Sequence, residues 1–130
     1  MIKPFKKKTT KTRDLISERL YMARKRSKGK RECTVTWEYL YDLLMQQKGI
    51  CTLTGLQMTL ETCRGNVISL DRIDSTKGYI PGNVQWVCYW ANTMKSDYPM
   101  PELINKMKIL IEYQEKQNAT RIEHHLWKFI

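Results

Sequence analysis

The sequence lacks the features that would place it in a membrane or outside the cell. No apolar run approaches the roughly 18 residues that span a bilayer, and the first residues lack the apolar core of a secretory signal. Four cysteines are present, but they form no Cys-x-x-Cys pair and show no regular spacing. The thiols of a chain without an export signal are usually reduced, so we expect no disulfide framework. These absences predict an intracellular protein without a membrane partner.

Length and composition set the scale of the fold. With 130 residues and 42% hydrophobic content, the chain suits one compact domain with a modest core. It contains no repeat and no low-complexity tract. A second full domain is therefore not expected.

Positive charge is concentrated near the N-terminus. The net charge is +10, and residues 1–32 hold 13 Lys and Arg against 3 Asp and Glu, whereas residues 33–130 hold 10 against 10. Such asymmetry predicts binding to a polyanion, because basic side chains that neutralise phosphates release the counterions bound there. Two alternatives are a solvated basic tail and a helix that lies on a membrane surface. The candidate nucleic-acid contacts are Lys6, Lys7, Lys8, Lys11, Arg13, Arg24, Lys25, Arg26, Lys28, Lys30, Arg31 and Lys77.

Hydrophobic spacing predicts a mixture of helices and strands. We expect a basic flexible arm over residues 1–12, a main domain over 13–116, and a tail or helix over 117–130. Within the domain, helices are predicted over 13–26 and 37–48, with Thr36 as an N-cap, and from Pro101 onward. Short β-prone segments are predicted at 33–36, 67–71 and 84–87, with a helical segment at 88–97.

Chemistry-bearing residues cluster in one strand–loop–strand–helix segment. Its motifs read Ser69-Leu-Asp-Arg-Ile-Asp74, Lys77-Gly-Tyr79, Gly82-Asn-Val-Gln-Trp-Val-Cys88 and Ala91-Asn-Thr-Met-Lys95. An aspartate at the end of the first strand and an amide on the helix can face one pocket, so that a single ion bridges them.

This combination resembles the catalytic hairpin of HNH endonucleases, and most closely the small phage-type members. The resemblance implies an α+β fold in which a ββα-metal hairpin, residues 67–97, packs with flanking α-helices. It implies Asp71 and Asn92 as ligands of one Mg²⁺ or Mn²⁺ ion and Asn83 as the residue that pins the loop. Lys95 would point towards a DNA phosphate. Taken singly, Asp71 could instead pair with Arg72 or Lys77, Asn83 could serve a turn, and Asn92 could cap a helix.

Arg72 stands where this family usually has its histidine base. Guanidinium has no acceptor lone pair, so we expect Arg72 to grip the scissile phosphate instead. Four groups remain as candidate proton acceptors: a metal-bound hydroxide, Asp74, the phenol of Tyr79, and an imidazole from His124 or His125.

The sequence also departs from those HNH relatives that carry structural zinc. The two expected Cys-x-x-Cys pairs read Cys51-Thr-Leu-Thr54 and Cys88-Tyr-Trp-Ala91. Half of each pair is missing, so structural zinc is not expected, and a Cys₃His site using Cys51, Cys63 and Cys88 has no support from spacing. Five side chains are expected to fill the space as core: Leu53, Leu56, Val87, Trp90 and Ala91. Tyr89 is likewise expected in the core.

The resulting hypothesis is a metal-dependent endonuclease or nickase acting on double-stranded DNA, as a monomer or homodimer, in the host cytoplasm if phage-encoded. In a first alternative, the chain keeps the HNH scaffold but is a non-catalytic DNA-binding module. RNA as the target, and an adaptor that recruits a protein through its C-terminal helix, are further alternatives. Arg72 is the residue that most favours the non-catalytic module.

Overall fold

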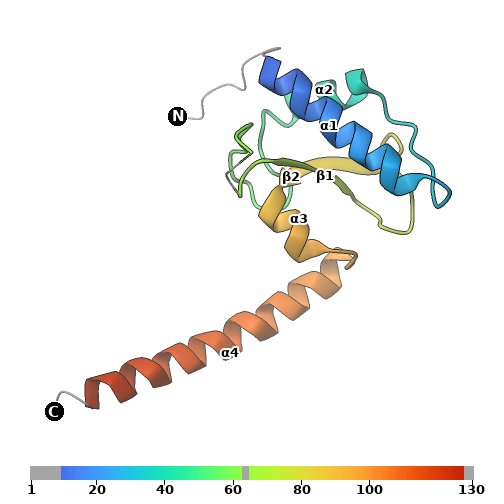
Figure 1. Cartoon of the computed structure of the whole chain (residues 1–130). Coiled ribbons are helices and arrows are strands. Elements are labelled where there is room, and N and C mark those ends of the chain that lie inside the picture. Colours follow the sequence, from blue (N-terminus) through green and yellow to red (C-terminus); the bar gives the residue numbers. More distant parts are fainter. Residues whose placement is uncertain (1–9, 63–64, 128–130) are drawn as a thin grey trace. The chain divides into compact units, whose positions relative to one another are not determined.

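An antiparallel β-hairpin lies at the centre of the first of two compact units, which cover Met1–Asp97 and Tyr98–Ile130. The computed structural model describes residues 10–62 and 65–127, with side chains to residue 125. The first unit contains α1 (Thr10–Ser27), α2 (Trp37–Gln46), β1 (Ile68–Arg72), β2 (Val84–Cys88) and α3 (Tyr89–Lys95). The second contains α4 (Met100–Trp127). The described residues thus confirm the predicted α+β class (Figure 1).

The register of the hairpin decides which side chains can meet. Ile68 pairs with Cys88 at one end and Arg72 with Val84 at the other, so that Asp71 lies opposite Gln85. Directly opposed residues have Cβ atoms about 4.5–5.5 Å apart, which allows their side chains to interact.

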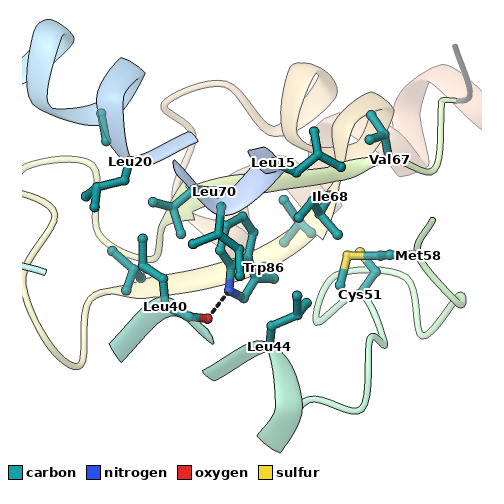
Figure 2. Close-up of a cluster of buried hydrophobic side chains, with 14 of the residues drawn as sticks. Leu15, Leu20, Leu40, Leu44, Cys51, Met58, Val67, Ile68, Leu70 and Trp86 are labelled. Atoms are coloured by element: carbon teal, nitrogen blue, oxygen red, sulfur yellow. Dashed lines mark hydrogen bonds between the residues drawn. The ribbon is translucent and has the colours of Figure 1, made fainter. Parts of the chain in front are cut away.

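One face of the hairpin is covered by α1 and α2. Ile16, Leu40, Ile68 and Trp86 are fully buried in the shared core, which Figure 2 shows in part. The indole N–H of Trp86 donates to the main-chain oxygen of Leu40 at 2.8 Å, drawn as a dashed line in Figure 2. Because this buried N–H has an acceptor, the hydrogen bond offsets the cost of removing it from water, and the large aromatic stabilises the core.

Several predicted boundaries shift. α1 begins at Thr10, so residues 10–12 belong to a helix and not to an arm, and Thr12 is buried. The expected strand at 33–36 reduces to a single bridge between Cys33 and Tyr79. Thr36 caps α2 as predicted, because its side chain accepts a hydrogen bond from the Tyr39 N–H at 3.1 Å.

The C-terminal region is helical through Trp127, and its helix begins one residue before Pro101. The boundary between the two units falls at Asp97, inside the range 13–116 assigned to one domain. The side chains of Leu126 and Trp127 lie outside the described part of the chain, as do residues 1–9 with Lys6, Lys7 and Lys8. Among the helices described, none is both long and apolar enough to cross a bilayer.

Three residues expected in the core are exposed. Leu56, Tyr89 and Trp90 are 45%, 57% and 39% exposed. In α3 the buried positions are Ala91 and Lys95, four residues apart on one face, so Tyr89 and Trp90 turn outward. Leu53 packs partly against the core, while Val87 and Ala91 are buried as expected.

Candidate active site in an arginine-lined pocket

A hollow of about 400 Å³ joins the end of α1 to the hairpin and α3. We call it the arginine pocket. Its charged and amide side chains come from four segments of the first unit: Arg26, Arg31, Asp71, Arg72, Asn92 and Asp97. Sequence analysis placed Arg26 and Arg31 among the nucleic-acid contacts and Asp71, Arg72 and Asn92 in the catalytic set. The structure brings these two groups together.

Asp71 is held between two donors and is 6% exposed. Gln85 Nε2 donates to its Oδ2 at 2.9 Å from the opposing strand, and Lys95 Nζ donates to its Oδ1 at 3.1 Å from α3. Gln85 was missed by sequence reasoning, although the cross-strand register would have indicated it.

Lys95 does not have the predicted orientation. Its residue is 2% exposed, and its ammonium contacts Asp71 and, at 2.9 Å, the main-chain oxygen of Arg72. Position 95 lies one turn after the buried Ala91, so α3 turns this lysine inward towards β1. A buried ammonium needs a partner, and Asp71 provides it. Lys95 therefore fixes Asp71 instead of reaching out to a phosphate, and Asp71 pairs with neither Arg72 nor Lys77.

Asn92 shares the pocket with Asp71, as expected. Its Nδ2 donates to Ser69 Oγ at 2.8 Å and, more weakly, to the Leu70 oxygen at 3.4 Å. These bonds leave Oδ1 as an acceptor, because the amide nitrogen is held by β1.

The donor set suits a hard cation. Asp71 accepts one hydrogen bond at each oxygen, and a carboxylate offers about four lone-pair sites, so acceptor capacity remains. In the described part of the chain, no three His, Cys, Asp or Glu side chains gather into a metal-ligating group. A carboxylate and an amide oxygen are the kind of donors that Mg²⁺ takes, because this ion usually binds one or two protein oxygens and keeps several waters or substrate phosphate oxygens.

Arg72 is immobilised at the edge of the pocket. Its Nη1 donates to the main-chain oxygens of Ser75 at 2.6 Å and Lys77 at 3.0 Å. Its Nη2 lies 3.9 Å from Asp97 Oδ1, and its Cζ lies 5.4 Å from the ring centroid of Tyr79. The loop thereby fixes the guanidinium, so little side-chain entropy remains to be lost when an anion binds.

Asn83 pins the hairpin loop, as the resemblance implied. Its Oδ1 accepts from the Asp74 N–H at 2.9 Å, and its Nδ2 donates to the oxygens of Asp74 at 3.0 Å and Gly78 at 2.8 Å. The side chain thus binds three main-chain groups of the turn, of which the Asp74 oxygen also accepts from the Lys77 N–H.

The same loop brings Arg31 to the pocket. The Tyr79 N–H donates to the Glu32 oxygen at 3.0 Å, and the Thr34 N–H donates to the Tyr79 oxygen at 2.9 Å. A methyl group at Gly78 would overlap the Glu32 oxygen, so this crossing requires glycine. The contact joins segments that are far apart in the sequence.

The candidate proton acceptors differ in their surroundings. Hydrogen bonds from the Thr76 hydroxyl and main-chain N–H lower the pKa of Asp74, which disfavours proton uptake, and Asp74 does not line the arginine pocket. Tyr79 is 5% exposed and lines it. His124 and His125 belong to the second unit, where they line a hollow on α4.

The remaining predicted nucleic-acid contacts are exposed but do not line this pocket. They lie on α1, in the turn after it and in the hairpin loop: Lys11, Arg13, Arg24, Lys25, Lys28, Lys30 and Lys77. Lys6, Lys7 and Lys8 lie outside the described residues. The α1 end therefore carries a basic surface next to the pocket.

Cys51 and Cys88 meet where the two incomplete Cys-x-x-Cys pairs approach each other. The Cys88 N–H donates to Cys51 Sγ at 3.2 Å, and both cysteines are free thiols. Burial, followed by the neighbouring Cys51, raises the pKa of Cys88 to about 11. Burial also raises the pKa of Cys51, but hydrogen bonds from Thr54 and Cys88 outweigh it, and the net shift is downward. Cys63 lies outside the described residues.

The chain resembles a protein of Enterobacteria phage T4 described as an "Uncharacterized 29.0 kDa protein in dda-modA intergenic region". The two are 36% identical over 100 residues, which cover 77% of this chain and 38% of the phage protein. The chain thus spans less than two-fifths of the length of this relative. No protein-family model and no solved structure matches the chain.

Proposed function

We propose that the protein is a metal-dependent DNA endonuclease or nickase with an HNH-type ββα-metal site. One observation carries this proposal: oxygen donors suited to a hard cation, Asp71 and Asn92, share a pocket with the guanidinium groups of Arg26, Arg31 and Arg72. Phosphodiester hydrolysis needs both kinds of group, because the transition state gains negative charge on oxygen.

Asp71 and Asn92 would hold one Mg²⁺ or Mn²⁺ ion. When bound, such an ion lowers the pKa of a coordinated water and stabilises charge on the reacting phosphate. Lys95 and Gln85 hold the Asp71 carboxylate in one orientation, and β1 holds the Asn92 amide through Ser69. The ligands are therefore positioned before the ion binds.

Arg72 would bind the scissile phosphate, and Arg26 and Arg31 would bind its neighbours. All three are permanently charged and present planar groups that match phosphate oxygens. Tyr79 lines the same pocket and remains a candidate for proton transfer. Its phenol is tested by Tyr79→Phe, which removes only the hydroxyl.

Double-stranded DNA is the proposed partner. The basic residues of α1 supply phosphate contacts that bind without reading sequence. The relative in phage T4 supports a phage setting and hence the cytoplasm of an infected cell. One site cuts one strand, so a monomer would nick, whereas a double-strand break would require a homodimer or two events.

The decisive experiment incubates supercoiled plasmid with the protein in Mg²⁺, Mn²⁺ or chelator. We expect nicking that needs the metal and is lost in Asn92→Ala and Asp71→Asn. Asn105→Ala, an exposed amide on α4, is the matched control and should cut normally. Because Asp71 has a buried partner, circular dichroism must show that its variant is folded. Metal-independent nicking, or unchanged nicking by Asn92→Ala, would sink the proposal.

The buried Lys95 favours a second candidate, a non-catalytic DNA-binding module. Its ammonium already neutralises Asp71, as an internal cation would. In that case plasmid would be retarded on a gel but stay supercoiled in every metal. Asn92→Ala would then bind like the wild type, whereas replacing Arg72 with alanine would weaken binding.

A further inference from the structure

A second hollow of about 190 Å³ opens beside the arginine pocket, between α1 and the start of α3. We call it the side pocket. Five residues line both hollows: Arg26, Ser69, Leu70, Tyr79 and Tyr89. The two hollows are therefore adjacent, and a ligand held by its phosphate in the arginine pocket would reach the side pocket past these residues.

The side pocket has a mixed lining, in which apolar side chains and one exposed aromatic ring stand beside polar groups. Met22 and Ala23 contribute from α1, and Tyr89 stands at the border with the arginine pocket. Tyr89 is 57% exposed, yet its main chain is fixed, since its N–H donates to the Val67 oxygen at 2.9 Å. An accessible ring on a fixed main chain offers a stacking surface for a flat heterocycle.

A polar pair completes the lining. Arg19 Nη1 lies 3.4 Å from Glu18 Oε1, and Arg19 Nε donates to the main-chain oxygen of Ile68 at 2.9 Å. The pair offers an acceptor and a donor next to the apolar walls, which matches the mixed hydrogen-bonding edge of a nucleobase. The volume lies below the roughly 300–1,000 Å³ of pockets for drug-sized ligands, so it suits one ring system.

Charge and continuity together identify the occupant. Three guanidinium groups in one hollow match a phosphate, and a small hollow of mixed polar and apolar lining beside it matches the attached base. A base inside a duplex is stacked and paired, so it cannot enter a side pocket while its phosphate stays in place. The occupant must therefore be an unpaired nucleotide.

We infer that the side pocket binds the base of an unpaired nucleotide in a DNA strand, stacked on Tyr89. This deepens the proposed function and rests on it for the choice of DNA. Among duplexes, the preferred substrate would be double-stranded DNA with an extruded base, ahead of a perfect duplex. Tyr89 would discriminate between substrates without taking part in bond cleavage.

The test measures binding in chelator, so that cleavage cannot interfere. Fluorescence anisotropy compares a short perfect duplex, the same duplex with one extra unpaired 2-aminopurine, and the RNA form of the bulged duplex. We expect the bulged DNA to bind about 5- to 150-fold more tightly than the perfect duplex, the range given by one stacked base. Stacking should also quench the 2-aminopurine emission.

Variants assign the effect to Tyr89. Tyr89→Leu should remove both the preference and the quenching, Tyr89→Phe should keep both, and Tyr21→Leu, an equally exposed tyrosine on α1, should keep both. Equal binding of bulged and perfect duplexes, a preference that survives Tyr89→Leu, or tighter binding of RNA would overturn the inference.

The plasmid assay separates this result from the proposed function. If the preference for unpaired DNA depends on Tyr89 while plasmid stays intact in every metal, the nuclease proposal fails and the nucleotide site stands. If plasmid is nicked in a metal-dependent way but Tyr89→Leu changes nothing, the nuclease stands and the nucleotide site fails.

Discussion

The buried ammonium of Lys95 lies 3.1 Å from Asp71 Oδ1 and also binds the main-chain oxygen of Arg72. Lys95→Met should cost about 3–5 kcal/mol in the free energy of unfolding, because it leaves a buried carboxylate uncompensated. Urea denaturation followed by tryptophan fluorescence measures this loss.

Two controls accompany that measurement. Lys25→Met removes an exposed lysine of α1 and should change stability by no more than about 0.5 kcal/mol. The double variant Asp71→Asn/Lys95→Met removes both charges and should be more stable than Lys95→Met alone. A double variant no more stable than the single one would contradict the ion-pair interpretation.

Gly78→Ala should destabilise the first unit by about 1–3 kcal/mol, because the new methyl group would overlap the Glu32 oxygen and force the two segments apart. That separation would also displace Arg31, so DNA affinity should fall with stability. Thermal unfolding and anisotropy measure the two effects. Gly65→Ala is the control, since its methyl group would meet Trp90 at 3.5 Å, an ordinary contact. Equal stability of both variants would show that the crossing tolerates a side chain.

Cys88 should make stability depend on alkaline pH. Its pKa is raised to about 11 in the folded state from an ordinary value of 9.0, so the unfolded state loses this proton first. The contribution is fully present below pH 9 and is lost as the pH rises towards 11. The free energy of unfolding should therefore fall over this range more steeply for the wild type than for Cys88→Ala. Parallel curves would show that the thiol has no shifted pKa.

Gln85→Leu should weaken the binding of Mn²⁺ about 10- to 100-fold, because Asp71 loses the donor that orients its Oδ2. The measurement is the electron paramagnetic resonance signal of free Mn²⁺ during titration, which requires no cleavage. Gln117→Leu, on α4, is the matched control. If Gln85→Leu bound Mn²⁺ like the wild type, Gln85 would not position the ligand.

Local patterns predicted the elements of the site, but not all of its contacts. Alternation and turn residues located both strands, and the capping preference of threonine located the start of α2 at Thr36. The spacing of Asp71 and Asn92 correctly placed both side chains in one pocket. The strands and the helix cap depend on residues close together in the sequence, and the pairing of Asp71 with Asn92 depends on the strand–loop–strand–helix order of one continuous segment.

The predictions for three side chains of α3 were wrong, namely Tyr89, Trp90 and Lys95. Both faces of this short helix carry apolar residues, so the sequence alone did not show that Ala91 and Lys95 face the hairpin while Tyr89 and Trp90 face outward. The sequence also did not show that Arg31 and Arg72 line one pocket, because this depends on the contact between the segment at Glu32 and the hairpin loop at Gly78. The contact between Gln85 and Asp71 could have been predicted, because it follows from the strand register alone.

The arginine pocket also couples ligand binding to folding. Arg26 and Arg31 come from the first quarter of the chain and Arg72 from beyond its middle, so only the folded state gathers their like charges. Their mutual repulsion opposes folding, and a bound anion relieves it. A ligand that binds only the folded state raises the free energy of unfolding as its concentration rises. The protein without a bound anion should thus be less stable than its complex, and the proposed nucleic-acid ligand would protect the fold from unfolding.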